Sequence, residues 1–195
     1  MKVIALNASA RKDGNTAILL NTVLDELKNE GIKTDMIQLA GKTLRGCTAC
    51  NKCMKTLDKH CAVKKDILND IIDQMLSADG ILLGSPTYFS DVTANMRAFI
   101  ERSGRVSRAN DYMLKRKVGA GVVAVRRAGA IPAFTGMFLY LHYMQMVIPG
   151  SSYWNVGIGR DIGDVLKDEE GLQTMKTLGQ NMAWLLKKVA DPKKK

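Results

Sequence analysis

The sequence predicts an α/β fold built on a doubly wound, five-stranded parallel sheet, with a cysteine-rich loop after the second strand. Short apolar runs alternate with longer amphipathic segments along the chain, which is typical of strands joined by helical crossovers. The first run is apolar throughout rather than at every second residue, as expected for a strand buried on both faces. All four cysteines fall within one irregular segment that follows the second strand.

The N-terminal elements are defined by clear signals. We predict a buried strand over Lys2–Ala8 and a polar loop over Ser9–Gly14. A helix follows over Asn15–Glu30, because its apolar residues recur on one face, and Gly31 ends it. The second strand spans Lys33–Leu39.

The segment Ala40–Lys65 is irregular, and irregular stretches of that length inside a compact domain are usually functional. The alternation then resumes. The remaining predicted elements are helices over Asp66–Ser77, Val92–Ser107, Ile131–Met146 and Asp168–Val189, and strands over Gly80–Gly84, Lys117–Val125 and Val147–Trp154, the last interrupted by Pro149-Gly150. We place residues 1–190 in a single domain and residues 191–195 in a basic tail.

Composition argues against several classes of protein. The chain has 195 residues, of which 46% are hydrophobic, so it can bury a substantial core. No apolar run approaches the ~20 residues that cross a membrane, and no secretory signal precedes the first strand, so we expect a cytoplasmic protein without a membrane partner. The formal charge of +10 favours acidic partners or anionic cofactors. Aromatic residues make up only 6% and no nucleic-acid-binding motif is present, so we expect no nucleic-acid partner.

The cysteines Cys47, Cys50, Cys53 and Cys61 have the spacing C-x2-C-x2-C-x7-C. Two-residue gaps form a tight loop whose sulfurs can converge, and four thiolates are the usual ligands of an iron–sulfur cluster. Zinc sites more often combine one C-x2-C pair with a second, distant pair. Disulfides are rare in cytosolic proteins. The spacing therefore favours an iron–sulfur cluster, with redox-active thiols and zinc as the alternatives.

Three loops leave the carboxyl ends of predicted strands, where sheets of this type bind ligands. The first, Asn7–Thr16, carries hydroxyl groups, Arg11 and the free N–H groups of a helix start, which together suit a phosphate. It has neither the G-x-G-x-x-G pattern nor that of a P-loop. Helix capping by Asn15 and Thr16 is the alternative explanation.

The other two loops follow strands three and four. In Ser85–Ser90, Pro86 stiffens a loop whose aromatic residues can border a flat ring, although an ordinary turn with a core aromatic residue explains it equally well. In Val125–Gly129, the glycine permits close approach of the backbone to a ligand. Its arginines are equally well explained as surface charges.

Together these loops resemble those of the flavodoxin-like NAD(P)H-dependent FMN reductases, and the cysteine segment resembles the iron–sulfur flavoprotein subgroup of that family. The segment Asn155–Val165 also resembles the subgroup, so the resemblance spans nearly the whole chain. It implies FMN as cofactor and a [4Fe-4S] cluster bound by Cys47, Cys50, Cys53 and Cys61. It further implies that the phosphate is held by Ser9, Arg11, Asn15 and Thr16, that the ribityl chain and ring are lined by Pro86, Thr87, Tyr88 and Phe89, and that the ring is approached by Arg126, Ala128 and Gly129.

The expected function is that of an FMN-dependent oxidoreductase in electron transport. In the leading hypothesis, a ferredoxin or another small electron carrier reduces FMN by way of the cluster, and FMN reduces a small-molecule acceptor. One alternative is a cluster-free FMN or quinone reductase that uses NAD(P)H, and a second is a thiol or metal redox sensor. His60 and His142 are not an obvious catalytic pair, and we predict no dedicated proton-transfer residue.

The segment Pro132–Ile148 predicts self-association. It is rich in large apolar residues on nearly every side, and one sheet face can cover only one side of a helix. We therefore expect a homodimer or homotetramer with this helix in the interface and the flavin close by, as the resemblance also implies.

Overall fold

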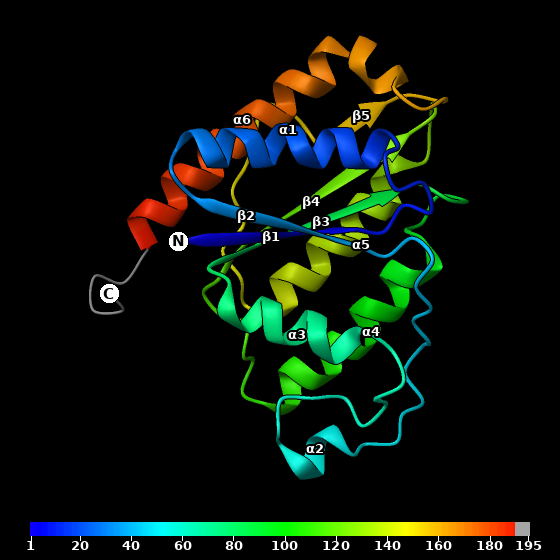
Figure 1. Cartoon of the computed structure of the whole chain (residues 1–195), viewed down its shortest axis with the longest axis vertical. Coiled ribbons are helices and arrows are strands. Elements are labelled where there is room, and N and C mark those ends of the chain that lie inside the picture. The colour runs from blue at the N-terminus through cyan, green and yellow to red at the C-terminus, as the bar shows by residue number, and fades with distance from the viewer. Residues whose placement is uncertain (190–195) are drawn as a thin grey trace.

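A computed structural model describes residues 1–189 and shows an α/β fold with helices on both faces of a central sheet (Figure 1). The sheet has five parallel strands in the order β2-β1-β3-β4-β5. They are β1 (Lys2–Asn7), β2 (Lys33–Gln38), β3 (Gly80–Pro86), β4 (Val118–Val125) and β5 (Val156–Ile158). The chain winds outward from β1 in both directions, so the strand order reverses between β1 and β3, and the loops after these two strands lie side by side.

The helices divide into two layers. On one face, α1 (Asn15–Asn29) packs against α6 (Glu169–Val189), and α3 (Leu68–Ser77), α4 (Ala94–Ala109) and α5 (Ala130–Tyr143) cover the other, as Figure 1 shows above and below the sheet. Successive residues of a strand point to opposite faces. In β1, Val3 and Ala5 therefore join the core beneath α1 and α6, whereas Ile4 and Leu6 join the core beneath the other three helices.

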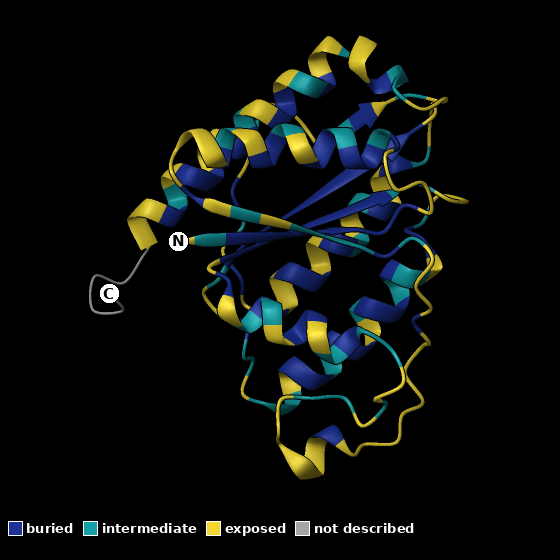
Figure 2. Ribbon diagram, in the orientation of Figure 1, coloured by how far each residue is buried: buried dark blue, intermediate teal, exposed yellow. Residues whose placement is uncertain are grey.

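The pattern of burial explains why the sequence signal was strongest for the inner strands. All eight residues of β4 are buried, and most of the length of the inner strands is dark blue in Figure 2. The edge strand β2 has no fully buried residue. The predicted helices and the first four strands are confirmed, with ends that differ by a few residues.

The fifth strand was predicted in the wrong place. It was expected over Val147–Trp154, but β5 is Val156–Ile158 and pairs with the end of β4. In the predicted segment, Val147 forms an isolated bridge with Val118. Pro149 follows two residues later and has no N–H to donate to the ladder, so the segment leaves the sheet before β5 begins.

The cysteine-rich segment projects from the layer formed by α3 and α4, at the bottom of Figure 1. Its regular structure is one helical turn, α2 (Cys53–Thr56). Elsewhere in the chain, the short 3-10 helix η1 (Asp164–Lys167) follows β5. Within residues 1–189, no helix is both long enough and apolar enough to cross a bilayer. The basic tail predicted for residues 191–195 lies outside the described residues.

Candidate functional site

The loop after β1 is shaped by its own polar side chains. Asn7 is buried, and its Oδ1 accepts a hydrogen bond from the Ser9 N–H (3.1 Å) while its Nδ2 donates to the Lys12 carbonyl (3.2 Å). The Ser9 Oγ accepts from the Arg11 N–H (3.1 Å). Helix α1 then starts directly after Gly14, and no side chain in the described structure caps it. Uncapped N–H groups at a helix start attract anions, so this loop offers a phosphate site.

The loop after β5 covers the start of α1. Asn15 joins the two loops, because its Nδ2 donates to the Asp161 carbonyl (2.9 Å) and its Oδ1 accepts from the Gly163 N–H (2.9 Å). Arg11 is exposed, and its Nη1 lies 3.5 Å from the Arg160 carbonyl. The Asn15 side chain thus holds the loop after β5 against the start of α1, and the exposed Arg11 guanidinium lies at the edge of this contact.

The loops after β3 and β4 are in contact. Tyr88 and Asp91 exchange two backbone hydrogen bonds (2.9 and 3.0 Å) around a tight turn in which Phe89 and Ser90 have positive φ (50° and 60°). Gly129, with φ 84°, approaches this turn so closely that a Cβ there would lie 2.6 Å from the Ser90 Oγ. The turn presents the Phe89 ring, which is fully exposed, and the half-exposed Tyr88 ring at the carboxyl edge of the sheet.

Thr87 carries a buried polar atom that lacks a partner. Its N–H donates to the Ala124 carbonyl (2.9 Å), which fixes the residue between β3 and β4. Its Oγ1 is buried, and no atom of residues 1–189 forms a hydrogen bond with it. An unsatisfied buried hydroxyl costs about 1–3 kcal/mol and is uncommon in proteins. This hydroxyl is therefore available to a water molecule or a ligand between the loops after β3 and β4.

A cavity of about 280 Å³ lies between the loop after β1 and the turn after β3, with Ser9 and Tyr88 in its lining. Thr93 also lines it and holds α4 in place beside it. The Thr93 Oγ1 accepts from the Met96 N–H (3.3 Å), which caps α4, and donates to the Ala8 carbonyl (3.0 Å). The start of α4 is thereby tied to the loop that suits a phosphate.

All four cysteines line a second, narrow cavity between the cysteine-rich segment and α4. Cys47 and Cys50 are exposed, Cys61 is partly buried and Cys53 is buried. Burial, followed by the nearby Cys61, raises the pKa of the Cys53 thiol. The space between the cysteines, about 20 Å³, has room for one water molecule. Among residues 1–189, no three His, Cys, Asp or Glu side chains stand where they could already hold a metal ion.

Helix α4 ties down the cysteine-rich segment along its whole length. Near its start, the Asn95 Nδ2 donates to the Lys42 carbonyl (2.9 Å). In its middle, the Glu101 Oε2 accepts from the Cys47 N–H (3.1 Å). Just beyond its end, the Asn110 Oδ1 accepts from the Lys59 N–H (3.0 Å). The helix that begins at the predicted flavin loops is therefore also the wall against which the cysteines are arranged.

Arg102 of α4 is the largest fully buried side chain among residues 1–189, with 1% of it exposed. Its Nη1 forms an ion pair with Asp66, and its Nη2 donates to the Val63 carbonyl (3.2 Å). Its Nε lies 3.4 Å from the Cys61 Sγ. Burial opposes the charge, but the hydrogen bonds to Asp66 and Cys61 outweigh it and raise the pKa of Arg102. A permanent positive charge therefore stands behind the cysteines.

Residues 1–161 match the family of NADPH-dependent FMN reductases. This chain is a member of that family. Over 194 residues it is 36% identical to an iron-sulfur flavoprotein of Methanocaldococcus jannaschii, with 96% of this chain and 98% of the relative covered. It is 33% identical over 195 residues to an iron-sulfur flavoprotein of Archaeoglobus fulgidus, with 93% and 94% covered. The protein thus falls in the iron–sulfur flavoprotein subgroup of the FMN reductases and is an FMN-dependent oxidoreductase.

Solved structures confirm the fold of this FMN reductase. RosB with a bound flavin-phosphate intermediate superposes with a TM-score of 0.75 at 15% identity, covering 97% of this chain and 80% of RosB. An archaeal flavodoxin superposes with a TM-score of 0.62 at 19% identity, covering 96% and 99%. The predicted flavodoxin-like sheet is therefore confirmed.

The residues predicted to bind FMN lie on three loops at one edge of the sheet. Asn15 joins the first of these loops to the loop after β5, and Gly129 brings the loop after β4 against the turn after β3. Thr16 is buried beneath the helix start, and Arg126 and Ala128 are exposed beside Gly129. Their contacts with FMN stay predictions.

Several residues of the site were not predicted from sequence: Asn7, Asp66, Thr93, Glu101, Arg102 and also Arg105, which lines the cysteine cavity. A signal existed for Arg102, because it falls on the apolar face of its helix, three residues after Phe99 and four before Val106. Asn7 gave no comparable signal, since a polar residue at the end of a strand is common. Its role follows from the two hydrogen bonds that only the folded loop shows.

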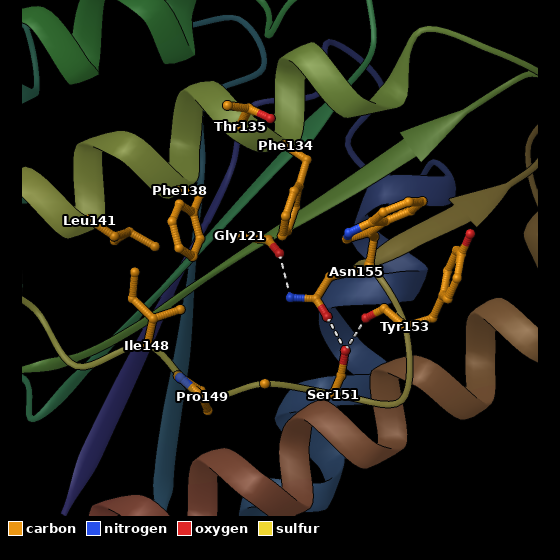
Figure 3. A pocket seen from close by; sticks show the side chains of 12 residues that line it. Gly121, Phe134, Thr135, Phe138, Leu141, Ile148, Pro149, Ser151, Tyr153 and Asn155 are labelled. Carbon is orange, nitrogen blue, oxygen red and sulfur yellow. Dashed lines mark hydrogen bonds between the residues drawn. The ribbon is translucent and has the colours of Figure 1, made fainter.

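This flavoprotein has a further cavity of about 430 Å³. It lies between β4, α5 and the segment that precedes β5 (Figure 3). Asn155 closes its base by donating from Nδ2 to the Gly121 carbonyl (3.0 Å). Phe134 and Phe138 of α5 face into it in Figure 3, and Phe138 is also partly exposed to solvent. The predicted interface helix is therefore apolar on an exposed side as well as on its buried side, whereas the assembly itself stays a prediction.

Proposed function

We propose that this oxidoreductase passes single electrons from a ferredoxin or similar small carrier, through a [4Fe-4S] cluster on Cys47, Cys50, Cys53 and Cys61, to FMN for the reduction of a small-molecule acceptor. One observation carries the proposal: four cysteines line one cavity of an FMN reductase fold. A cluster supplies one-electron transfer, and a flavin couples it to two-electron chemistry.

The protein's part in FMN binding follows from the three loops. The uncapped start of α1 and the Arg11 guanidinium neutralise the phosphate. The unpartnered Thr87 hydroxyl supplies a hydrogen bond to the cofactor. The rings of Tyr88 and Phe89 border the flavin, and Gly129 allows the backbone after β4 to approach it.

The donor set fits an iron–sulfur cluster. Four thiols share the cavity, no carboxylate of the described residues lines it, and the side chains of Arg102 and Arg105 give it a positive wall. The space between the thiols is small, and Cys47 and Cys50 are exposed, so binding a cluster would require the cysteine-rich segment to rearrange around it. Iron-sulfur flavoproteins that cover nearly the same length, such as that of Methanosarcina thermophila at 27% identity, support this assignment by name.

The partners and setting of the protein are part of the proposal. A formal charge of +10 attracts acidic electron carriers over long range, and we propose no nucleic-acid partner, no membrane partner and a cytoplasmic location. We also propose a homodimer or homotetramer built on α5, whose Leu139 and Tyr143 are more than half exposed. Sedimentation that shows only a 21.4 kDa species would contradict this assembly.

A cluster-free reductase that oxidises NAD(P)H is the second candidate. The family is described by NADPH use, and part of the chain is 31% identical over 83 residues to an NAD(P)H dehydrogenase (quinone) of Acidithiobacillus ferrooxidans, which covers 42% of this chain. In that case the cysteines would be vestigial or structural. A thiol or metal redox sensor that is not an enzyme is the third candidate.

Anaerobic purification distinguishes these functions. Iron, acid-labile sulfide and FMN are measured per chain, together with the rate of NAD(P)H oxidation. Four irons and four sulfides with FMN support the proposal, and Cys50→Ala should lose the iron but keep FMN, because the two sites are built from different loops. Rapid NAD(P)H oxidation by iron-free protein supports the second candidate. Zinc or free thiols without flavin would support a sensor.

A further inference from the structure

Two arginines of α4 line the cysteine cavity. The Arg102 Nε lies 3.4 Å from the Cys61 Sγ, within hydrogen-bonding distance for sulfur. Arg105, one helical turn later, lines the same cavity. Its Nε is buried and has no hydrogen-bond partner among the described residues, although its Nη2 donates to the Asn51 side chain.

The two guanidinium groups differ in how their charges are compensated. The Arg102 charge is paired with Asp66, whose side chain is 8% exposed. Arg105 has Glu101 one turn earlier on α4, but the Glu101 carboxylate accepts from the Cys47 backbone rather than from the arginine. One N–H of each arginine is therefore left for the sulfurs. An unsatisfied buried donor is costly, so the Arg105 Nε requires an acceptor that the cavity can supply.

We propose that Arg102 and Arg105 set the reduction potential of the cluster held by Cys47, Cys50, Cys53 and Cys61, which rests on the function proposed above. Reduction adds one electron from an external donor and no proton, so the cluster gains one unit of negative charge. Hydrogen bonds to the sulfurs and positive charges in a buried site favour the more negative state. The two arginines therefore raise the potential at which the cluster accepts its electron.

A purely structural role makes a different prediction. If the arginines only fasten the cysteine-rich segment to α4, replacing them lowers stability or cluster content and leaves the potential of the assembled cluster unchanged. The reduction potential is therefore the informative measurement, and it does not depend on turnover of the enzyme.

The test uses anaerobically reconstituted full-length protein, titrated with dithionite in the presence of redox mediators while the reduced cluster is followed by electron paramagnetic resonance. Arg105→Gln removes the charge but keeps an N–H at the position of Nε, and Arg105→Lys removes the Nε donor but keeps the charge. Arg102→Lys keeps a cation for Asp66 and loses the contact with Cys61. Arg108→Gln is the matched control, because Arg108 is exposed on the same helix and does not line the cysteine cavity.

Arg105→Gln should lower the potential so that, at a fixed applied potential, the ratio of reduced to oxidised cluster falls about tenfold, equivalent to about 59 mV for a one-electron couple. Arg105→Lys and Arg102→Lys should lie between this variant and the wild type, and Arg108→Gln should match the wild type. If Arg102→Lys does not fold, the potentials of Arg105→Gln and Arg105→Lys decide the test. Equal potentials in wild type and both Arg105 variants would overturn the proposal while leaving the cluster intact. Wild-type protein that takes up no iron and sulfide would refute the cluster and this role with it.

Discussion

Replacing Thr87 by valine separates the stability of the protein from its affinity for FMN. The two side chains have nearly the same shape, so the substitution removes the hydroxyl and little else. That hydroxyl is buried without a partner in the described structure. An unsatisfied buried polar group costs about 1–3 kcal/mol, so FMN-free Thr87→Val should be more stable than the wild type by about 1 kcal/mol.

The effect on binding has the opposite sign. If the Thr87 hydroxyl forms a hydrogen bond with FMN, the variant loses that bond and leaves an atom of the cofactor unpaired. A loss of about 1–2 kcal/mol corresponds to a roughly 5- to 30-fold weaker affinity. Urea unfolding of the FMN-free protein and titration of FMN by fluorescence measure the two effects separately.

Thr93→Val is the matched control. Its hydroxyl is also buried but has two partners, the Met96 N–H and the Ala8 carbonyl. Losing this cap should destabilise the FMN-free protein by about 1–2 kcal/mol. If Thr87→Val were also less stable than the wild type, or bound FMN with unchanged affinity, the Thr87 hydroxyl would not be a hydrogen-bond partner of FMN and the reasoning would fail.

Three other predictions test the phosphate loop, the contact between loops and the buried ion pair. Arg11→Glu should weaken FMN binding by tens-fold, on the order of 2 kcal/mol, because it places a negative charge beside the phosphate, and an unchanged dissociation constant in a flavin titration would refute this site. Gly159→Ala would place a Cβ 2.7 Å from the Asn15 Nδ2 and should destabilise the fold by about 1–3 kcal/mol in urea, whereas Gly150→Ala, in open space, should be neutral. Burial opposes ionisation of Asp66, but hydrogen bonds from its arginine partner lower the pKa of Asp66 overall. The unfolded chain therefore binds the proton first as the pH falls. The contribution of this ion pair to the free energy of unfolding should be constant above about pH 4 and fall below it. Asp66→Asn should show a smaller fall when unfolding is followed at each pH.

Local sequence determined most of the architecture. A strand buried on both faces must be apolar throughout, and a helix on a sheet must repeat its apolar residues about every 3.6 positions, so β1, α1 and β4 were visible in the chain. The cysteine spacing likewise identified the segment that carries the thiols, because residues close in sequence must be close in space. The error at β5 arose where that logic is weakest, because a short edge strand carries few residues. The apolar segment before it forms a single bridge with β4, at Val147, and then leaves the sheet.

Tertiary structure alone decided which polar groups meet. Arg102 and Cys61 are 41 positions apart, and Asn15 and Gly163 are 148 apart, so no local pattern relates them. These contacts exist because parallel strands bring their carboxyl ends to one edge and because α4 runs from that edge beneath the cysteine-rich segment. The free hydroxyl of Thr87 is equally invisible in the sequence, since the absence of a hydrogen-bond partner is a property of the folded surroundings and not of the residue.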